Sequence, residues 1–299
     1  TKFFNTPGGQ LHAVDGVSFK IEEGRTLGIV GESGCGKSTT GRTILKLLEP
    51  TGGKILFDGK DITNYSRKQM RPLRQEMQMV FQDPFSSLDP RQTVMQLISE
   101  PIIEHKLLKS KSDIEERTLE LMRTVGLAER YMNVYPHELD GGRRQRIGIA
   151  RALAVRPKLI VCDEPVSALD VSIQAQVINL LMDIKKEMDL TILFIAHNLA
   201  VVKYFSDRIG VMYFGNMVEL ADADELYDHP VHPYTKALLS AIPQPDPLSE
   251  KNKERLYYDP SIHDYSVEQP RFQEIRPGHF VYASDSEMEK YRKELEEQG

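Results

Sequence analysis

Cysteine is scarce in this chain of 299 residues, which contains only two. Cys35 lies in a glycine-rich segment and Cys162 in an apolar run, so neither residue suggests a disulfide. This usage is typical of a reducing compartment, and we expect the chain to be cytoplasmic. Because no cysteine follows Cys162, the C-terminal part of the chain cannot hold a cysteine-ligated iron–sulfur cluster.

Long apolar runs and an excess of positive charge are missing as well. The longest apolar candidates, 159–162 and 191–196, have the length of strands, whereas a membrane-spanning helix needs roughly 18 apolar residues. We therefore expect any membrane association to come through other subunits. A formal net charge of −6 argues against a general nucleic-acid-binding protein. No signal-peptide pattern opens the chain, and Thr1 reads as the middle of an element, so we expect residues to precede it.

The segment 31–39 reads GESGCGKST and fits the phosphate-binding pattern G-x-x-x-x-G-K-S. It follows a strand-like run at 27–30 and precedes a helix-like segment at 40–48, which is the context that a phosphate loop requires. Glycines allow successive backbone N–H groups to face phosphate oxygens, and the helix dipole adds positive potential. Lys37 is expected to reach the β- and γ-phosphates, and Ser38 to ligate Mg²⁺. The residues expected to bind the nucleotide are Gly31, Ser33, Gly34, Cys35, Gly36, Lys37, Ser38 and Thr39.

Two carboxylates end the apolar run at 159–162. Asp163 is expected to hold Mg²⁺ through water, as the acidic partner of Ser38. Glu164 is expected to act as the general base on the water that attacks the γ-phosphate. The alternative is that both acids are only the solvated start of a loop.

Two further polar residues fit the same site. His197 ends the apolar run at 191–196, where it can donate to the γ-phosphate or fix Glu164 and the water. A histidine in such a place can also be a purely structural residue. Gln82 lies between a strand and a helical insert, so it can touch Mg²⁺ or the water and move with the insert.

The remaining pattern predicts an α/β fold with a helical insert. Strands are expected at 14–21 and at 54–57, the second followed by a tight turn. The pattern between 83 and 138 is helical, with Ser112 as the cap of a helix at 113–125. The two apolar runs read as parallel core strands, because their apolar character is continuous. A helix is also expected at 144–154.

The amino-acid composition changes after Pro243. The chain becomes polar and charged there, and it ends in a helix-like segment at 286–297. Among the prolines that interrupt this part are Pro245, Pro247, Pro270 and Pro277.

These motifs together resemble the ATP-binding subunit of an ABC transporter. The matching segments cover about residues 1–240 and are 31–39, Gln82, 139–143, 159–164, 167–170 and His197. Three further segments resemble the oligopeptide/dipeptide importer branch of that family. They are FQDPFSSLDPR at 81–91, HPVHPYTKALL at 229–239 and PGHFV at 277–281.

The resemblance implies a P-loop NTPase (RecA-like) α/β core, an antiparallel β subdomain and an α-helical ABC subdomain at about 83–155. All three would form an ATP-binding domain at 1–240, followed by an oligopeptide-importer-type extension at 241–299. In that family two subunits sandwich two ATP molecules, and each site pairs one phosphate loop with the opposing signature. An aromatic residue near the N-terminus stacks on adenine, and Phe3 or Phe4 is expected in that role.

The chain departs from the family at the signature. The family has Leu-Ser-Gly-Gly-Gln, whereas this chain has Leu139 followed by Asp140, Gly141, Gly142 and Arg143. The glycines are kept, so backbone N–H groups can still face a phosphate. A carboxylate facing phosphate at about 4 Å costs ~4 kcal/mol at an effective dielectric near 20, although Arg143, Mg²⁺ and rotation of Asp140 can offset much of this. Since the signature serves the partner's ATP, we hypothesise a heterodimer with unequal sites, in which the site with this chain's phosphate loop hydrolyses ATP.

The sequence thus predicts a peripheral ATPase subunit on the cytoplasmic face of the cell membrane, driving import of oligopeptides or dipeptides. ATP and Mg²⁺ are the expected cofactors. The expected partners are a second ABC ATPase subunit, two transmembrane permease subunits and, through the complex, an extracytoplasmic substrate-binding protein; no nucleic acid is expected.

Other functions fit less well. The open alternatives are an ATP-binding regulatory subunit with little hydrolysis, and an ABC importer of oligosaccharide or nickel. An ABC ATPase of translation or DNA repair is disfavoured, because the chain has neither tandem nucleotide domains nor long coiled coils. Another P-loop enzyme, such as a GTPase or a kinase, is disfavoured because the sequence has no Asn-Lys-x-Asp motif that would read a base.

Overall fold

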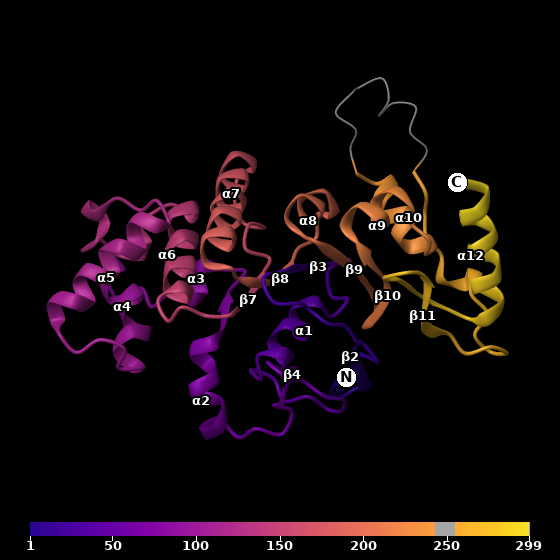
Figure 1. Cartoon of the computed structure of the whole chain (residues 1–299), viewed down its shortest axis with the longest axis horizontal. Coiled ribbons are helices and arrows are strands. Elements are labelled where there is room, and N and C mark those ends of the chain that lie inside the picture. Colours follow the sequence, from indigo (N-terminus) through magenta and orange to yellow (C-terminus); the bar gives the residue numbers. More distant parts are fainter. Residues whose placement is uncertain (243–254, 299) are drawn as a thin grey trace.

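An eight-stranded sheet runs through the centre of the molecule (Figure 1). The computed structural model describes residues 1–242 and 255–298. The five strands from β9 to β6 are parallel, and the three from β10 to β11 are antiparallel. The strand order is β11 (Arg271–Arg276), β12 (His279–Ala283), β10 (Asn216–Asp222), β9 (Arg208–Tyr213), β3 (Thr26–Val30), β8 (Thr191–Ile195), β7 (Leu159–Asp163), β6 (Met77–Val80). The core strands expected at 159–162 and 191–196 are confirmed as the neighbours β7 and β8.

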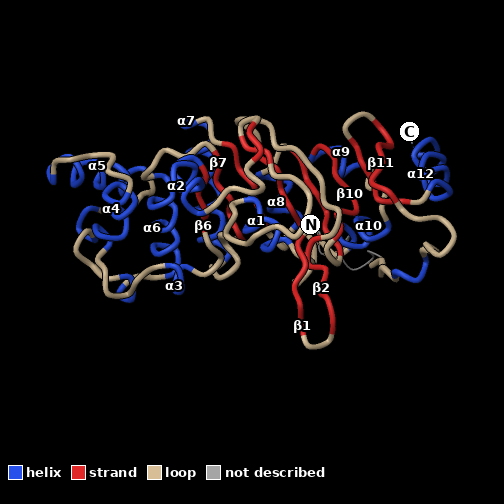
Figure 2. The backbone as a smooth tube through the Cα atoms, turned by 90° about the horizontal axis from the view of Figure 1, so that it is seen from below, coloured by secondary structure: helices blue, strands red, loops and turns tan. Residues whose placement is uncertain are grey.

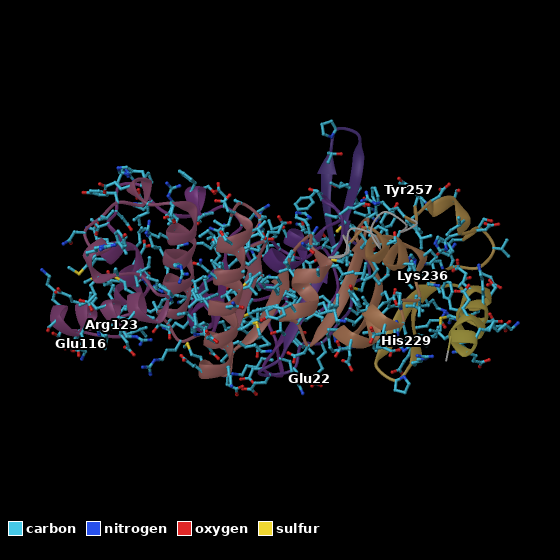
Figure 3. All side chains as sticks on the ribbon, turned by 90° about the horizontal axis from the view of Figure 1, so that it is seen from above. Glu22, Glu116, Arg123, His229, Lys236 and Tyr257 are labelled. Atoms are coloured by element: carbon cyan, nitrogen blue, oxygen red, sulfur yellow. The ribbon has the colours of Figure 1, made fainter. Side chains whose placement is uncertain are left out.

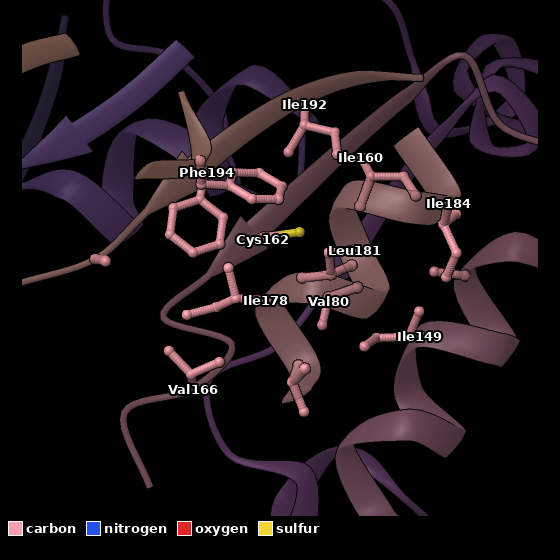
Figure 4. Close-up of a cluster of buried hydrophobic side chains, with 14 of the residues drawn as sticks. Val80, Ile149, Ile160, Cys162, Val166, Ile178, Leu181, Ile184, Ile192 and Phe194 are labelled. Atoms are coloured by element: carbon pink, nitrogen blue, oxygen red, sulfur yellow. The ribbon is translucent and has the colours of Figure 1, made fainter. Parts of the chain in front are cut away.

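Both faces of the parallel strands are covered by helices, which explains why these strands are apolar throughout. Ile160 and Cys162 of β7 belong to the apolar cluster on one face, together with Leu181 (Figure 4). Their neighbours Leu159 and Val161 belong to the cluster on the other face, because side chains alternate along a strand. The helices that contribute to the first cluster include α7 (Val171–Met188) and α8 (Leu199–Phe205), and those beside the second include α1 (Lys37–Ile44) and α2 (Arg67–Glu76).

A helical lobe, formed by α3 to α6, lies at one end of the molecule (Figure 1). It consists of α3 (Pro84–Ser87), α4 (Val94–Glu104), α5 (Lys111–Thr124) and α6 (Gly141–Leu153), with the 3-10 helices η1 (Glu129–Tyr131) and η2 (Pro136–Glu138). The helical character expected for 83–138 is confirmed. The expected cap Ser112 is wrong, because the helix begins earlier and Ser110 accepts the hydrogen bond from the Asp113 N–H.

Two small antiparallel pairs complete the N-terminal part. They are β1 (Lys2–Thr6) with β2 (Gly9–Val14), and β4 (Leu56–Phe57) with β5 (Lys60–Asp61). Figure 2 shows the hairpin of β1 and β2 projecting from the body of the molecule. The strand expected at 14–21 is wrong, since the described segment 15–21 forms no strand. Its alternating residues Val17, Phe19 and Ile21 still pack on the second apolar cluster, so the alternation reflects burial without a ladder partner.

The C-terminal part of the chain extends the central sheet. β12 pairs with β10 through Glu219 opposite Val281 and Leu220 opposite Phe280. The other elements here are α9 (Ala223–Asp228), α10 (Pro233–Ser240), η3 (Pro260–Ile262) and α12 (Asp285–Gln298). The last of these confirms the helix expected at 286–297. The domain boundary at residue 240 stays a prediction, and Pro243, Pro245 and Pro247 lie outside the described residues.

The molecule is elongated along the sheet. Figure 3 shows Glu116 and Arg123 of the helical lobe at the opposite end from Lys236 of α10. Among the helices that the structure describes, none is both long and apolar enough to cross a bilayer.

Candidate nucleotide site

The glycine-rich segment joins the end of β3 to the start of α1, and two of its glycines have no substitute. Gly31 has φ +151°, and a Cβ built on it would lie 2.1 Å from the carbonyl oxygen of Met212. Gly36 has φ +104°, and its Cβ would lie 2.0 Å from the carbonyl oxygen of Ala13. Only glycine tolerates such angles and such close backbone approaches. The helix expected at 40–48 begins at Lys37, so its first N–H groups, which have no partner within the helix, belong to the loop.

Lys37 is folded into the loop that it follows. Its side chain is only 4% exposed, and Nζ donates to the carbonyl oxygens of Gly31 (2.8 Å) and Glu32 (2.9 Å). A third contact joins Nζ to Nδ1 of His197 at 3.3 Å. The buried ammonium therefore lies at the mouth of the loop, next to the expected positions of the phosphates.

Ser38 and Asp163 meet at the junction of α1 and β7. The Ser38 hydroxyl donates to Oδ1 of Asp163 at 2.6 Å, and the other carboxylate oxygen is 3.4 Å from Nη2 of Arg42. Asp163 has no exposed surface. A hydroxyl and a carboxylate are the hard oxygen donors that Mg²⁺ prefers, and one or two protein ligands beside substrate phosphates are usual for it. The pair therefore fits Mg²⁺.

Glu164 lies next to Asp163 and is the centre of a polar network. Gln82 Nε2 donates to its Oε2 at 2.5 Å, and His197 Nε2 contacts its Oε1. Glu164 is only 4% exposed, so this carboxylate is held almost out of solvent. One continuous chain of contacts thus joins four segments of the chain, through Gln82, Glu164, His197 and Lys37.

The network fixes the tautomer of His197. An ammonium group has donors and no acceptor, so Nδ1, which faces Lys37 Nζ, must accept. The ring proton is then on Nε2, where it donates to Oε1 of Glu164. The histidine ring therefore bridges the ammonium of Lys37 and the carboxylate of Glu164.

The backbone at Glu164 is strained. Its φ is +50°, a left-handed conformation that costs roughly 1–3 kcal/mol for a residue with a side chain. The peptide is held there by its N–H, which donates to the carbonyl oxygen of Ile195 at 2.9 Å, and by the carbonyl, which accepts from Ser167. Such strain is found where the side chain must be aimed.

The signature segment starts α6 in the helical lobe. Asp140 is the N-cap, and its Oδ1 accepts from the backbone N–H of Arg143 at 2.8 Å. Oδ2 accepts from Nη1 of the same arginine at 2.5 Å, and that guanidinium lies over the ring of Tyr131. Gly142 is buried, and a Cβ on it would lie 2.6 Å from Ile173. The aspartate carboxylate is thus paired with an arginine of its own segment.

The remaining expected residues lie at the edges of the site. Phe3 stacks on His12 across the β1–β2 hairpin with ring centroids 3.9 Å apart, and Lys2 lies over the ring of Phe4. The end of β2 abuts the loop, as the approach of Ala13 to Gly36 shows. No contact in the structure separates Phe3 from Phe4 as the adenine-stacking residue.

Both cysteines are inert. Burial raises the pKa of Cys162 to about 12 and also raises the pKa of the Cys35 thiol, despite the nearby Lys37 ammonium. Both thiols therefore stay protonated at neutral pH, and the Cys35 sulfur lies 3.9 Å from Nζ of Lys37.

Three side chains at the site had no function predicted for them from the sequence. They are Arg42, His12 and Tyr234, whose hydroxyl accepts from the backbone N–H of Glu32 in the loop at 3.1 Å. Tyr234 lies in the segment 229–239 that resembles the importer branch, so the sequence motif itself could be recognised. The contact of Tyr234 with the loop could not be predicted from the sequence, because the two residues are 202 positions apart.

Comparison with known proteins places this geometry in a family. The model of the family described as "ABC transporter" matches residues 14–167, and that of "Oligopeptide/dipeptide transporter, C-terminal region" matches residues 218–267. The chain belongs to the ABC transporter family. It is 57% identical to the oligopeptide transport ATP-binding protein OppF of Bacillus subtilis over 96% of this chain and 95% of that protein. It is 52% identical to the dipeptide transport ATP-binding protein DppF of Lactococcus lactis over 95% and 92%.

Solved structures agree with this membership. The post-hydrolysis dimer of the ATP-binding cassette MJ0796 bound to ADP and Pi matches with a TM-score of 0.69 and 29% identity, over 74% of this chain and 95% of that one. The cbiO1 structure from Clostridium perfringens matches with a TM-score of 0.67 and 31% identity, over 75% and 87%. The predicted P-loop NTPase fold is confirmed, and the chain is an ABC-type ATPase. The roles of its individual site residues stay predictions.

Proposed function

We propose that this ABC ATPase hydrolyses MgATP to drive the import of oligopeptides or dipeptides. The observation that carries the proposal is the network of Gln82, Glu164, His197 and Lys37 assembled beside Ser38 and Asp163. The names of the relatives OppF and DppF supply the solute class.

The loop and the start of α1 would bind the phosphates of ATP. Lys37 would turn its ammonium from the Gly31 and Glu32 carbonyls to the β- and γ-phosphates, a short movement for a flexible stem. Ser38 and Asp163 would hold Mg²⁺, with Gln82 as a further ligand, and the ion would supply charge neutralisation at the phosphates when bound.

Glu164 would be the general base. One carboxylate oxygen takes a proton from the attacking water as its oxygen bonds to the γ-phosphorus, and the bond to the β-phosphate oxygen breaks to give ADP and phosphate. His197 and Gln82 each hold one oxygen of this carboxylate, so together they orient it. Such orientation matters because in-line attack depends on positioning more than on covalent chemistry.

The complex would contain more than this chain. We propose a second, different ABC ATPase subunit, two transmembrane permease subunits and an extracytoplasmic substrate-binding protein, with this chain on the cytoplasmic face of the membrane. The transport function in the relatives' names supports a membrane partner, since no described helix of this chain can span a bilayer.

We further propose that the two ATP sites are unequal. The Asp140 carboxylate accepts two hydrogen bonds from Arg143. This pairing supports the proposal, because the signature then offers no hydroxyl donor to the partner's γ-phosphate. The site that combines this chain's phosphate loop with the partner's signature would turn over rapidly, and the other slowly.

The first test replaces the proposed base. Glu164→Gln keeps the size of the side chain and an oxygen that can accept, but it removes the base. We expect hydrolysis at this chain's own site to fall ~100-fold or more. The dissociation constant for ATP should stay within about twofold of the wild type, because the carboxylate does not bind the phosphates. Phosphate release by the assembled complex and titration calorimetry measure the two effects.

A matched control is Glu187→Gln, the same change on an exposed position of α7. It should leave both quantities unchanged. A Glu164→Gln complex that still hydrolyses ATP at this site would refute the base assignment.

A second function is favoured by one observation. The Asp140–Arg143 pair compromises the signature, which would suit an ATP-binding regulatory subunit with little hydrolysis. Measuring ATPase activity of the chain alone and then with its partner separates the two functions. Identifying the solute that co-purifies with the complex distinguishes peptide from oligosaccharide or nickel.

A further inference from the structure

One peptide group at the entrance of the phosphate loop is held from both sides. It joins Gly31 to Glu32, and its carbonyl oxygen accepts from Lys37 Nζ at 2.8 Å. Its N–H donates to the hydroxyl oxygen of Tyr234 at 3.1 Å. Because residue 31 is a glycine, rotation of this group meets little steric resistance from its own side chain. The two hydrogen bonds are therefore what fixes its orientation.

Tyr234 is well placed to hold that group. The residue is only 2% exposed, and its ring packs between Tyr213 (centroids 4.6 Å apart) and Tyr258 (5.4 Å). Burial raises the pKa of Tyr234, and the charge of Glu32 acts in the same direction, so the hydroxyl stays neutral at physiological pH. The acceptor is thus a fixed, uncharged oxygen on a rigid ring.

The position of Tyr234 is in turn set by the C-terminal part of the chain. The residue is in the first turn of α10, and its N–H donates to Nδ1 of the capping His232 at 3.1 Å. The backbone N–H groups of Val231 and His232 donate to the buried carboxylate of Glu219 at 2.8 and 2.9 Å. The same carboxylate contacts Nε2 of His279 in β12 at 2.8 Å. Buried contacts therefore run from the added strand β12 to the phosphate loop.

We propose that Tyr234 is a positioning residue for the phosphate loop, through which the C-terminal part of the chain sets nucleotide affinity. Lys37 has three ammonium donors to share between the Gly31 and Glu32 carbonyls and the phosphates, so its hold on the Gly31 carbonyl changes when nucleotide binds. The Tyr234 hydroxyl holds the N–H side of the peptide group and competes with no phosphate. If the group turned over, its N–H would face the Lys37 ammonium, which is a donor facing a donor.

The expected consequence is a change in affinity without a change in chemistry. Without the tyrosine hydroxyl, only a fraction of molecules has the binding-competent loop, and the apparent dissociation constant rises as the inverse of that fraction. Tyr234 lies outside the network of Glu164 and His197. Turnover at saturating ATP should therefore be preserved.

The test is Tyr234→Phe in the full chain, which removes the hydroxyl and keeps the ring. We expect the dissociation constants for MgADP and MgATP, measured by calorimetry, to rise about three- to tenfold, the effect of one neutral hydrogen bond. In the assembled complex KM for ATP should rise by a similar factor at unchanged kcat. Amide hydrogen exchange should accelerate at Glu32.

The matched control is Tyr258→Phe, which removes a hydroxyl from a neighbouring ring of the same aromatic group. It should leave affinity within about twofold and exchange at Glu32 unchanged. Equal affinities of Tyr234→Phe and wild type, a loss confined to kcat, or an equal loss in Tyr258→Phe would each overturn the proposal. The inference rests on nucleotide binding at this loop. Wild-type binding tests that assignment, whereas the ratio between variants tests Tyr234, so the two can fail separately.

Discussion

An acidic residue stands at position 140, where the family signature has serine, and its carboxylate caps α6. The cap accepts the Arg143 N–H, as a serine hydroxyl oxygen would, so the start of the helix tolerates the exchange. On the proposed function, the exchange removes a hydrogen-bond donor toward the partner's γ-phosphate. Both carboxylate oxygens of Asp140 accept from Arg143, one from its backbone N–H and one from its guanidinium. The carboxylate charge is therefore partly offset before any nucleotide approaches. On the proposed function, the exchange therefore changes the contact of the signature with nucleotide while the start of the helix stays capped.

Restoring the signature tests this separation. In the double variant Asp140→Ser with Arg143→Gln, the cap is kept and a hydroxyl donor replaces the carboxylate. We expect turnover at the site that this signature serves to rise about 10-fold or more, because a donor replaces an acceptor at the γ-phosphate. ATPase activity of the assembled complex measures this turnover, and the partner's catalytic base is intact in both the wild-type and the variant preparation.

The matched control is Asp113→Ser with Arg123→Gln, the same two exchanges in α5. It should not change turnover, since both residues are exposed and lie away from the signature. No gain in the Asp140→Ser, Arg143→Gln complex would sink the idea of unequal sites.

At the scale of elements, the start of α5 shows how closely a cap can be missed. Ser110 and Ser112 are both serines near the helix start, and periodicity favoured the second. The structure places Ser110 outside the helix with an extended backbone, where its hydroxyl can reach the Asp113 N–H, whereas Ser112 is already within the first turn. A cap requires a non-helical residue, so only one of the two can act.

Alanine at each position should therefore have unequal effects. Ser110→Ala is expected to lower the free energy of unfolding by about 1 kcal/mol, the usual contribution of a cap. Ser112→Ala should be neutral or slightly stabilising, because alanine has the better helix propensity. Urea unfolding followed by far-ultraviolet circular dichroism compares them. A larger loss in Ser112→Ala would contradict the assignment of the cap.

At the scale of the whole molecule, the joint between β10 and β12 is held by buried charge. His279 contacts Glu219 through Nε2 and Glu225 through Nδ1, and the histidine and Glu219 have no exposed surface. Burial alone would lower the pKa of His279, but the hydrogen bonds and charges of Glu219 and then Glu225 outweigh it, so the pKa is raised. Arg276 also contacts Glu225, so this second carboxylate has two cationic neighbours.

The raised pKa makes the joint sensitive to pH. Its contribution is fully present below about pH 6.5, the pKa of an unfolded histidine, and is lost as pH rises through the higher folded value. We expect the difference in free energy of unfolding between wild type and His279→Gln to be largest near pH 6 and to shrink toward alkaline pH. Denaturant unfolding across that range measures it. A difference that is constant with pH would show that the pKa of His279 is the same in the folded and unfolded protein, and would contradict the raised value.

Local sequence was sufficient wherever a motif carries its own geometry. The phosphate loop, the acidic end of β7 and the buried strands were all predictable, because glycine spacing and continuous apolar runs have few structural solutions. Alternation at 15–21 misled, since it reports which side chains are buried and not whether the backbone has a partner. The period of an apolar pattern therefore does not show whether the segment pairs with another strand.

The sequence by itself determined that this chain binds a nucleotide and belongs with ABC ATPases, because the residues that do so lie in short motifs. Only the tertiary structure decided how those motifs act together. The contacts of Glu164 with Gln82 and His197, and of Tyr234 with Glu32, join segments 82, 33 and 202 positions apart along the chain. Such contacts depend on the order and register of the strands, and no local pattern of residues specifies these.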